Sequence, residues 1–286
     1  MISRLGPVWL VVVGILSVQL GAAVAKSLFG EISPTGMVWL RLATSAIVLV
    51  ALARPRFRGH SRDDWWVVLG FGLSLGTMNW AIYQSFALIP LGIAVTIEFI
   101  GPLTLAVLGS RRARDVIWVL LAAAGVVLLG FEPAGLDPLG VAYALLAGAS
   151  WAAYILLSAS TGRRWPGFDG LAVASLIAAV AMTLPALVVG GASLFEPRVL
   201  LLGVMIGLLS SVIPYSAELV ALRSLRPAVF GILMSLEPAA AALAAIVVLD
   251  EHLSPLQWLA IACVVGASVG ATRSGAAPAQ VEPAPD

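Results

Sequence analysis

Hydrophobic residues form long uninterrupted runs along this chain, and charged residues lie mainly between the runs. No charged side chain occurs in residues 5–25, 65–97 or 139–162. A helix needs about 20 apolar residues to cross the hydrocarbon core of a bilayer. Turn signals, such as Pro90 and Gly92, divide the longer runs. The pattern predicts an all-α integral membrane protein with ten transmembrane helices, at about 7–27, 34–53, 65–88, 92–110, 115–131, 138–158, 169–190, 199–222, 228–249 and 255–272.

The composition excludes a water-soluble chain. Hydrophobic residues make up 60% of the 286 residues and charged residues 11%, against roughly 45–50% and about 25% in a soluble domain. The first run has features of a signal peptide, with Ala23-Val24-Ala25 as a cleavage site, but its roughly 21 apolar residues exceed the 7–15 of a signal core. We expect it to be retained as a helix. Residues 274–286, rich in alanine and proline, are expected to form a disordered cytoplasmic tail.

Basic residues are distributed unevenly between the predicted loops. With a cytoplasmic N-terminus, the predicted outer segments hold only Lys26 and Arg198. Because basic residues accumulate in cytoplasmic loops, this asymmetry predicts that both termini are cytoplasmic. Topology therefore explains the basic loops without a nucleic-acid partner. The net charge of +1 also indicates no such partner. The thirteen basic residues on the predicted inner side are Arg4, Arg54, Arg56, Arg58, Arg62, Arg111, Arg112, Arg114, Arg163, Arg164, Arg223, Arg226 and Arg273.

Two distant segments are similar and indicate an internal repeat. An Ala-Leu pair at 87–88 is followed by Pro102, and one at 221–222 is followed by Pro238, each within a predicted helical hairpin. The hairpins are five predicted spans apart, and a repeat unit with an odd number of spans must run through the membrane in the opposite direction. The sequence therefore predicts two inverted five-helix repeats. Their expected bounds are residues 1–136 and 137–273.

Three predicted spans each contain two glycines four residues apart. Such a spacing lets helix backbones approach closely, and we expect it to serve packing within the chain rather than dimerisation. The pairs are Gly72 and Gly76, Gly203 and Gly207, and Gly266 and Gly270.

Five charged residues fall inside the predicted spans, where each costs about 2.5–3.5 kcal/mol on insertion scales. Arg41 and Glu98 lie at similar depth, about 10 Å below the outer side at roughly 1.5 Å per residue. Glu237 lies near the midplane. Lys26 ends the first span on the outer side, and Glu218 lies one turn from the inner end of its span. Each of these residues is a candidate for function.

Two interpretations of Arg41 and Glu98 stay open. In one, they form a buried ion pair that locks two helices together. In the other, they line a polar cavity between the halves with Glu237, where a guanidinium holds a carboxylate and a glutamate faces an ammonium. Lys26 is a further candidate for substrate binding, as part of a gate, and the alternative is an interfacial anchor whose stem reaches the surface. Glu218 is expected to pair structurally with an arginine of the following loop.

Prolines and uncharged side chains extend the candidate substrate site. Pro102 follows Glu98 by four residues, and Pro238 directly follows Glu237. Each proline frees a backbone carbonyl and is expected to kink its helix near the acid. Kinked helices of this kind suit a solute site near the midplane. Further candidates for its lining are Gln19, Asn79, Trp80, Tyr83, Gln84, Trp151, Tyr154 and Tyr215.

Several segments together resemble one transporter family. The chain is similar to the bacterial inner-membrane threonine/homoserine exporters, in the EamA-type branch of the drug/metabolite transporter superfamily, from its first predicted span to its last. The matching segments are PLGIAVTIEFIGP at 90–102, SRRARD at 110–115, SLEPAAAALA at 235–244, PYSAELVAL at 214–222, AKSLF at 25–29 and LRLA at 40–43.

This resemblance implies a ten-helix fold of two inverted halves that exports small amino acids from the bacterial cytoplasm across the inner membrane. Lys26, Arg41, Glu98, Glu218 and Glu237 lie inside the matching segments. No G-x-x-x-x-G-K-[ST] motif occurs, so an ion or substrate gradient must drive export. Proton antiport is the expected mechanism, with protonation of Glu98 or Glu237 alternating with binding of the substrate ammonium.

Three other functions stay open. A broad exporter of drugs or other metabolites would fit a small aromatic-lined cavity. A membrane-embedded enzyme would need clustered catalytic groups, and His60, His252 and Cys263 provide little for one. A non-transporting receptor is the third. No cofactor or metal site is expected, and the expected partners are a small amino acid and the lipid bilayer.

Overall fold

The computed structural model describes residues 6–108, 116–129, 135–214 and 227–273, with the single positions 217, 221 and 225. All regular structure within these residues is helical. Tyr215, Glu218 and the tail at 274–286 lie outside the described residues. The helices are α1 (Pro7–Ser27), α2 (Pro34–Ala53), α3 (Arg62–Phe86), α4 (Leu91–Glu98), α5 (Ile100–Leu108), α6 (Val116–Leu129), α7 (Pro138–Gly162), α8 (Asp169–Gly190), the 3-10 helix η3 (Gly191–Phe195), α9 (Pro197–Gly207), the π-helical turn η4 (Leu208–Val212), α11 (Pro227–Met234), α12 (Glu237–Leu249) and α13 (Pro255–Arg273).

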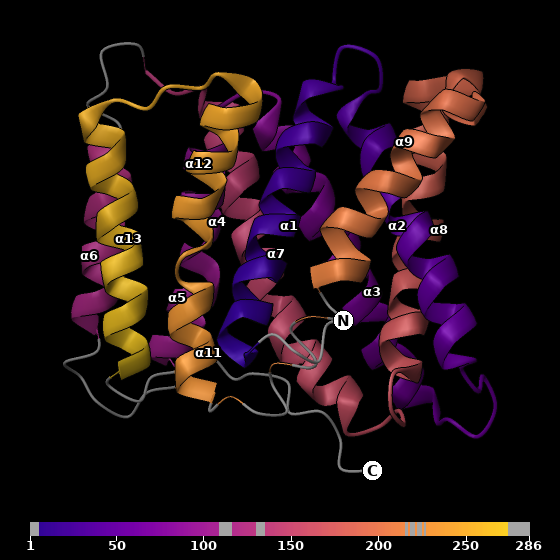
Figure 1. Ribbon diagram of the computed structural model, residues 1–286. Helices are drawn as coiled ribbons and strands as arrows, with labels where there is room; N and C mark the ends of the chain where they lie inside the picture. The colour runs from indigo at the N-terminus through magenta and orange to yellow at the C-terminus, as the bar shows by residue number, and fades with distance from the viewer. Residues whose placement is uncertain are drawn as a thin grey trace.

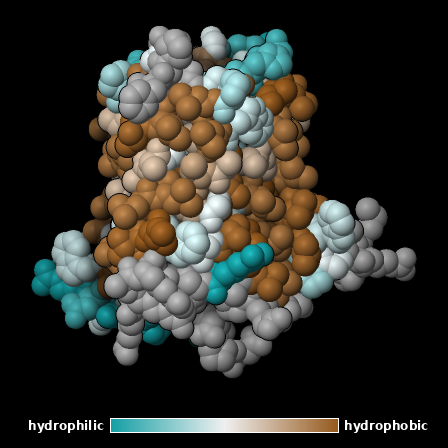
Figure 2. Space-filling view, turned by 90° about the vertical axis from the view of Figure 1, so that its left-hand side faces the viewer, coloured by the Kyte–Doolittle hydropathy of each residue, from teal (hydrophilic) through white to brown (hydrophobic). Residues whose placement is uncertain are grey.

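The described helices have the lengths and surfaces of a multi-pass membrane protein. Among the described residues, seven helical stretches are long and apolar enough to cross a membrane. Three shorter apolar stretches overlap the further predicted spans 92–110, 115–131 and 199–222: Leu91–Leu105, Val116–Leu128 and Pro197–Val212. Large hydrophobic side chains such as Leu52 and Val247 are exposed on the outside of the bundle. Figure 2 shows the exposed hydrophobic residues as a broad band with polar residues near its two ends.

The helices run between two opposite faces of the molecule (Figure 1). The upper face carries the connections 28–33, 87–90, 191–196 and 250–254, and the lower face carries 54–61 and 163–168. Helix α1 begins and α13 ends at the lower face. Of the described basic residues outside the middle of the bundle, only Lys26 and Arg198 belong to the upper face.

Polar caps determine where several helices begin. The first turn of a helix has N–H groups without helical acceptors, and a side-chain oxygen satisfies them. At the start of α3, Oγ of Ser61 accepts from the N–H of Asp64 at 3.2 Å and Oδ2 of Asp64 accepts from the N–H of Ser61 at 2.9 Å, which is a capping box. Asp137 accepts from the N–H of Leu139 at 2.7 Å ahead of α7. These local signals fix the first turns that follow the loops.

The span predicted at 92–110 is divided in two beside its glutamate. Helix α4 ends at Glu98, Phe99 forms a turn, and α5 follows. Because Pro102 has no N–H to donate to the carbonyl four residues earlier, the carbonyl of Glu98 loses its helical partner. The helix therefore ends at the acid itself.

The span predicted at 228–249 is divided in the same way. Helix α11 ends at Met234, two residues form a turn, and α12 begins at Glu237. Pro238 lacks the N–H that the carbonyl of Met234 would need. Each of the two broken helices therefore has a glutamate at its break.

Glycines bring helices of the two sequence halves into close contact. Added Cβ atoms at Gly72 and Gly76 of α3 would meet α8, and those at Gly203 and Gly207 of α9 would meet α2. An added Cβ at Gly270 of α13 would meet a tryptophan of α6. The structure therefore confirms packing within the chain for the first two pairs and for Gly270, whereas an added Cβ at Gly266 would meet no atom within 4 Å.

Gly101→Ala should destabilise the protein, because the new Cβ would overlap the backbone of Gly148 where α5 crosses α7. Overpacking of this kind costs about 2 kcal/mol and should lower the melting temperature of the purified protein by several degrees. Gly266→Ala in α13 is the matched control, because its new Cβ would meet no atom within 4 Å. Equal losses in both variants would contradict the packing described here.

Candidate functional site

Arg41 lies in the first half of α2 with its side chain buried in the bundle. Its Nη2 donates to the carbonyl of Ser210 at 2.9 Å, its Nε to Oγ of Ser211 at 3.3 Å and its Nη1 to the hydroxyl of Tyr83 at 3.3 Å. Its Cζ also lies 5.6 Å from the centroid of the Tyr83 ring. A buried charge is tolerated when its N–H groups find acceptors. These partners therefore hold the guanidinium in one position.

The acceptors from the second half of the sequence belong to the π-helical turn η4. Single π-helical turns within helices are frequent at functional sites. The carbonyl of Ser210 accepts from Arg41, and the neighbouring carbonyl of Leu209 accepts from Oγ of Ser17 in α1 at 2.7 Å. The hydroxyl of Ser210 is buried and has no hydrogen-bond partner within the described residues. Through its backbone, η4 connects α9 to both α1 and α2.

Glu98 is buried at the end of α4 and does not form the ion pair considered for it with Arg41. Among the described residues, no hydrogen bond or ion pair holds its carboxylate. The charge of Arg41 attracts it electrostatically. Its carbonyl faces α7, where a Cβ on Gly148 would lie 2.6 Å from it. Glu98 is therefore a buried acid in the field of a buried cation, at a helix break.

Glu237 is the buried first residue of α12, beside the second break. Helix α12 packs on α1. Within the break, Oγ of Ser235 lies 2.8 Å from the carbonyl of Gly231 and 2.7 Å from Oγ of Ser268 in α13. The second break thus combines an acid with two buried hydroxyl groups.

Two more of the predicted lining residues lie beside these groups. Asn79 is buried one helical turn before Tyr83 on α3, and its amide donates to the carbonyl of Leu75 at 2.9 Å. Trp151 of α7 meets Phe99 edge to face, with ring centroids 5.2 Å apart, at the break that follows Glu98.

Other predicted lining residues make contacts elsewhere. Trp80 and Gln84 both donate to Oγ1 of Thr35, at 3.2 and 2.9 Å, in the first turn of α2 near the upper face. Tyr154 packs against Phe71 with ring centroids 5.1 Å apart. Gln19 is buried in α1. Tyr215 and Glu218 lie outside the described residues.

Lys26 forms an ion pair at the upper face. Its Nζ lies 2.6 Å from Oε1 of Glu251, in the connection between α12 and α13, and donates to the carbonyl of Ile89 at 2.8 Å. The other carboxylate oxygen of Glu251 accepts from the N–H of Leu91 at 2.9 Å. Lys26 therefore joins three segments rather than reaching freely to the surface.

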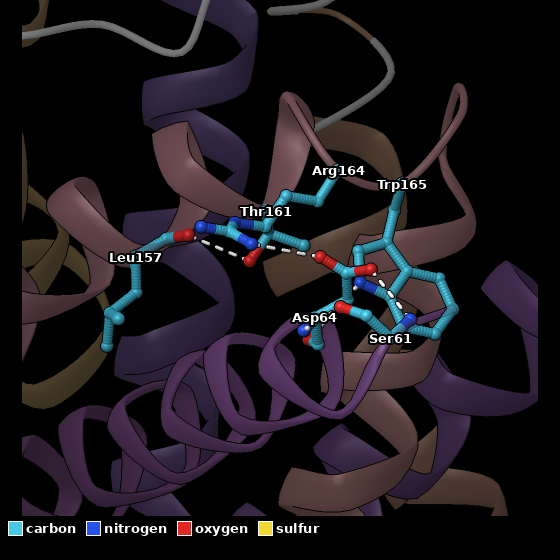
Figure 3. Close-up of polar contacts among 6 residues, drawn as sticks. All are labelled: Ser61, Asp64, Leu157, Thr161, Arg164 and Trp165. Carbon is cyan, nitrogen blue, oxygen red and sulfur yellow. Dashed lines mark hydrogen bonds and ion pairs between the residues drawn. The ribbon is translucent and has the colours of Figure 1, made fainter.

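A second polar cluster joins the two halves at the lower face (Figure 3). Nη1 of Arg164 donates to Oδ1 of Asp64 at 3.0 Å, and Nε1 of Trp165 reaches the carbonyl of Asp64 at 3.5 Å. The ring of His60 stacks on that of Trp165 with centroids 3.6 Å apart. The start of α3 is thereby fixed to the connection between α7 and α8.

Three residues whose side chains or carbonyls hold the charged groups of Arg41 and Lys26 were not predicted from the sequence: Ser210, Ser211 and Glu251. Two adjacent serines inside an apolar run are a weak signal for a polar site. Glu251 follows the ninth predicted span on the side where Lys26 ends the first. Their common position on the predicted outer side is the signal from which an ion pair between Lys26 and Glu251 could have been predicted.

The second half of the chain, residues 138–273, matches the model of the EamA-like transporter family. The threonine/homoserine exporter RhtA of Salmonella typhimurium (strain LT2) is 41% identical over 280 residues, covering 94% of each chain. This chain belongs to the EamA-like transporter family. RhtA of Escherichia coli (strain K12) is 41% identical over 273 residues, covering 93% of this chain and 92% of its own.

Two further comparisons fit this membership. The uncharacterized transporter YwfM of Bacillus subtilis (strain 168) is 34% identical over 170 residues, which cover 58% of this chain and 57% of YwfM. A crystal structure of a protein with 22% sequence identity has a TM-score of 0.62 and covers 93% of this chain and 96% of its own, which shows the shared fold. As a member of a transporter family whose relatives are named exporters, the chain is a transporter and not an enzyme.

Tyr83→Phe should lower the free energy of unfolding by about 1–3 kcal/mol, because it leaves an N–H of a buried guanidinium without its acceptor. Thermal unfolding of the purified protein measures this loss. Tyr143→Phe is the matched control, since the hydroxyl of Tyr143 has no hydrogen bond within the described residues. A Tyr83→Phe variant as stable as the control would show that the hydroxyl does not hold Arg41.

Proposed function

We propose that this transporter exports small amino acids of the threonine/homoserine type from the bacterial cytoplasm across the inner membrane, by alternating access. The printed names of the relatives from Salmonella and Escherichia supply the substrate class. The observation that carries the proposal is the buried guanidinium of Arg41, which the second half of the chain holds at η4. A fixed cation inside a bundle is suited to bind the carboxylate that amino acids share.

The packing of the helices supports two inverted five-helix repeats. The repeats would pair α1 with α7, α2 with α8, α3 with α9, α4–α5 with α11–α12, and α6 with α13. Helices α2 and α8, α4 and α12, and α6 and α13 each pack against their own equivalent. Other contacts also occur in matching pairs. Helix α3 packs on α7, and the equivalent helices α9 and α1 also pack together. Helix α1 packs on α12, and the equivalent helices α7 and α4 do the same. Two halves related in this way can rock about a shared site.

The lower face is the cytoplasmic face in this proposal, and both termini are cytoplasmic. Basic residues concentrate in cytoplasmic loops, and the described connections of the lower face hold Arg54, Arg56, Arg58, Arg163 and Arg164. The upper face, with Lys26 and Arg198, then faces outward. Export moves the substrate from the lower face to the upper one.

In the proposed substrate complex, Arg41 binds the carboxylate and Glu98 faces the ammonium. Three of the five guanidinium N–H groups are used by Ser210, Ser211 and Tyr83, so within the described residues two are left for a ligand. Glu98 is buried, and no hydrogen bond or ion pair with a described residue holds its carboxylate. Glu237 at the second break is the other acid proposed to take part in proton coupling. Asn79, Tyr83 and Trp151 would line this region.

Cells that express the chain and are preloaded with radiolabelled threonine should release it faster than cells with an empty vector. Arg41→Gln should reduce release to the empty-vector level, because the carboxylate loses its cation. Arg198→Gln removes an exposed cation of the upper face and should leave release unchanged. Wild-type release from an Arg41→Gln variant would contradict the proposal, and resistance to toxic hydrophobic cations without threonine release would favour the broad-specificity alternative.

Proton antiport predicts faster threonine release as the external medium is acidified from about pH 8 to pH 6, because protons then enter as the amino acid leaves. Burial favours the neutral form of a carboxyl group, so a buried glutamate can carry that proton. Glu98→Gln or Glu237→Gln should abolish the acceleration, since an amide takes up no proton at these pH values. If both variants keep the wild-type rate and the wild-type response to pH, these acids do not couple export to protons.

A further inference from the structure

A second pair of opposite charges, Lys26 and Glu251, lies at the upper face, outside the proposed substrate site. The side chains of Lys26 and Glu251 are 17% and 20% exposed, so both remain partly accessible while they pair. Each is also anchored to the backbone around α4, Lys26 through the carbonyl of Ile89 and Glu251 through the N–H of Leu91. The pair holds together the end of α1, the start of α4 and the connection that follows α12.

Helix α4 connects this pair directly to the deeper charges. Leu91 begins α4 and Glu98 ends it, so the two lie about 10 Å apart at roughly 1.5 Å per residue. Arg41 lies at the same depth in α2 as Glu98 in α4, because equal numbers of residues separate each from the upper end of its helix. One cation and one anion therefore occur deep in the bundle, and the same combination recurs about two helical turns further out.

We propose that Lys26 and Glu251 form an exit subsite for a zwitterionic α-amino acid. In this subsite, Lys26 takes the substrate carboxylate and Glu251 takes the substrate ammonium while their mutual ion pair opens. The inference rests on the proposed amino-acid export and on the outward orientation of the upper face. It assigns a substrate-binding role to Glu251 and a specific partner group to Lys26.

The energetics of ion pairs explain why the substrate itself would open the pair. A zwitterionic substrate supplies an equal charge to each partner, so the exchange replaces one ion pair with two and costs little. Separating the pair without such an exchange leaves two partly desolvated charges unpaired, which is unfavourable. A solute without both charges offers no replacement partner. The pair therefore selects for zwitterions at the exit.

Glu251→Gln tests the subsite in right-side-out membrane vesicles loaded with several concentrations of labelled threonine. Glutamine keeps the size of the side chain and an oxygen for the N–H of Leu91, and it removes the charge. We expect the maximal efflux rate to fall about tenfold, as the loss of one charge-assisted hydrogen bond predicts. The KM for internal threonine should stay unchanged, because the deeper site is intact.

Three further variants separate the subsite from a structural role. Asp250→Asn removes the neighbouring charge, whose side chain is 92% exposed and lies outside the pair. Asparagine tolerates the positive φ of 56° at this position, so this variant should keep the wild-type rate. Lys26→Met should reduce the maximal rate as Glu251→Gln does, and Lys26→Arg, which keeps the charge, should retain most of it.

The opposite results would overturn the proposal. If the ion pair only kept the upper face closed, removing one of its charges would leave the efflux rate at the wild-type value or raise it. Wild-type or faster rates from Glu251→Gln and Lys26→Met would therefore contradict the subsite. A raised KM with an unchanged maximal rate would also contradict it. If wild-type vesicles themselves release threonine and homoserine no faster than vesicles without the protein, the proposed function fails instead.

Discussion

The burial of one guanidinium inside an apolar helical bundle is the constraint on which the rest of this structure depends. An unpaired charge in such surroundings costs several kcal/mol, so Arg41 requires acceptors that the bundle itself supplies. They come from Tyr83 of α3 and from two serines of η4, which belong to opposite halves of the sequence. The guanidinium therefore fixes α2, α3 and η4 relative to one another. It is also the group that gives the interior a charge suited to an amino-acid carboxylate.

The acids at the helix breaks depend on a second constraint, the close approach of backbones. Proline at 102 removes the helical partner of the Glu98 carbonyl, and Gly101 and Gly148 let α5 and α7 approach at that point. Larger residues would push the helices apart and move Glu98 away from the field of Arg41. Glu98 thus lies at one end of α4, and the Lys26–Glu251 pair lies at the other.

Much of this arrangement could be predicted from the sequence, because hydrophobic runs define spans and charges inside them are costly. Arg41, Glu98 and Glu237 are visible for that reason, and Pro102 and Pro238 indicate where helices break. The partners of Arg41 could not be predicted in the same way. Its shortest bond goes to a backbone carbonyl of a π-helical turn, and any residue carries such a carbonyl. Glu251 lies in a short loop, where an acid is ordinary until the fold brings Lys26 to 2.6 Å.

The most direct test of the central claim, that Arg41 recognises the substrate carboxylate, is calorimetric binding to the purified transporter. Threonine and threoninol differ only in that threoninol has a hydroxymethyl group in place of the carboxylate. The account predicts that threonine binds to the wild-type protein, that threoninol does not, and that Arg41→Gln loses threonine binding. Equal binding of the two compounds to the wild-type protein, or unchanged threonine binding to Arg41→Gln, would contradict it.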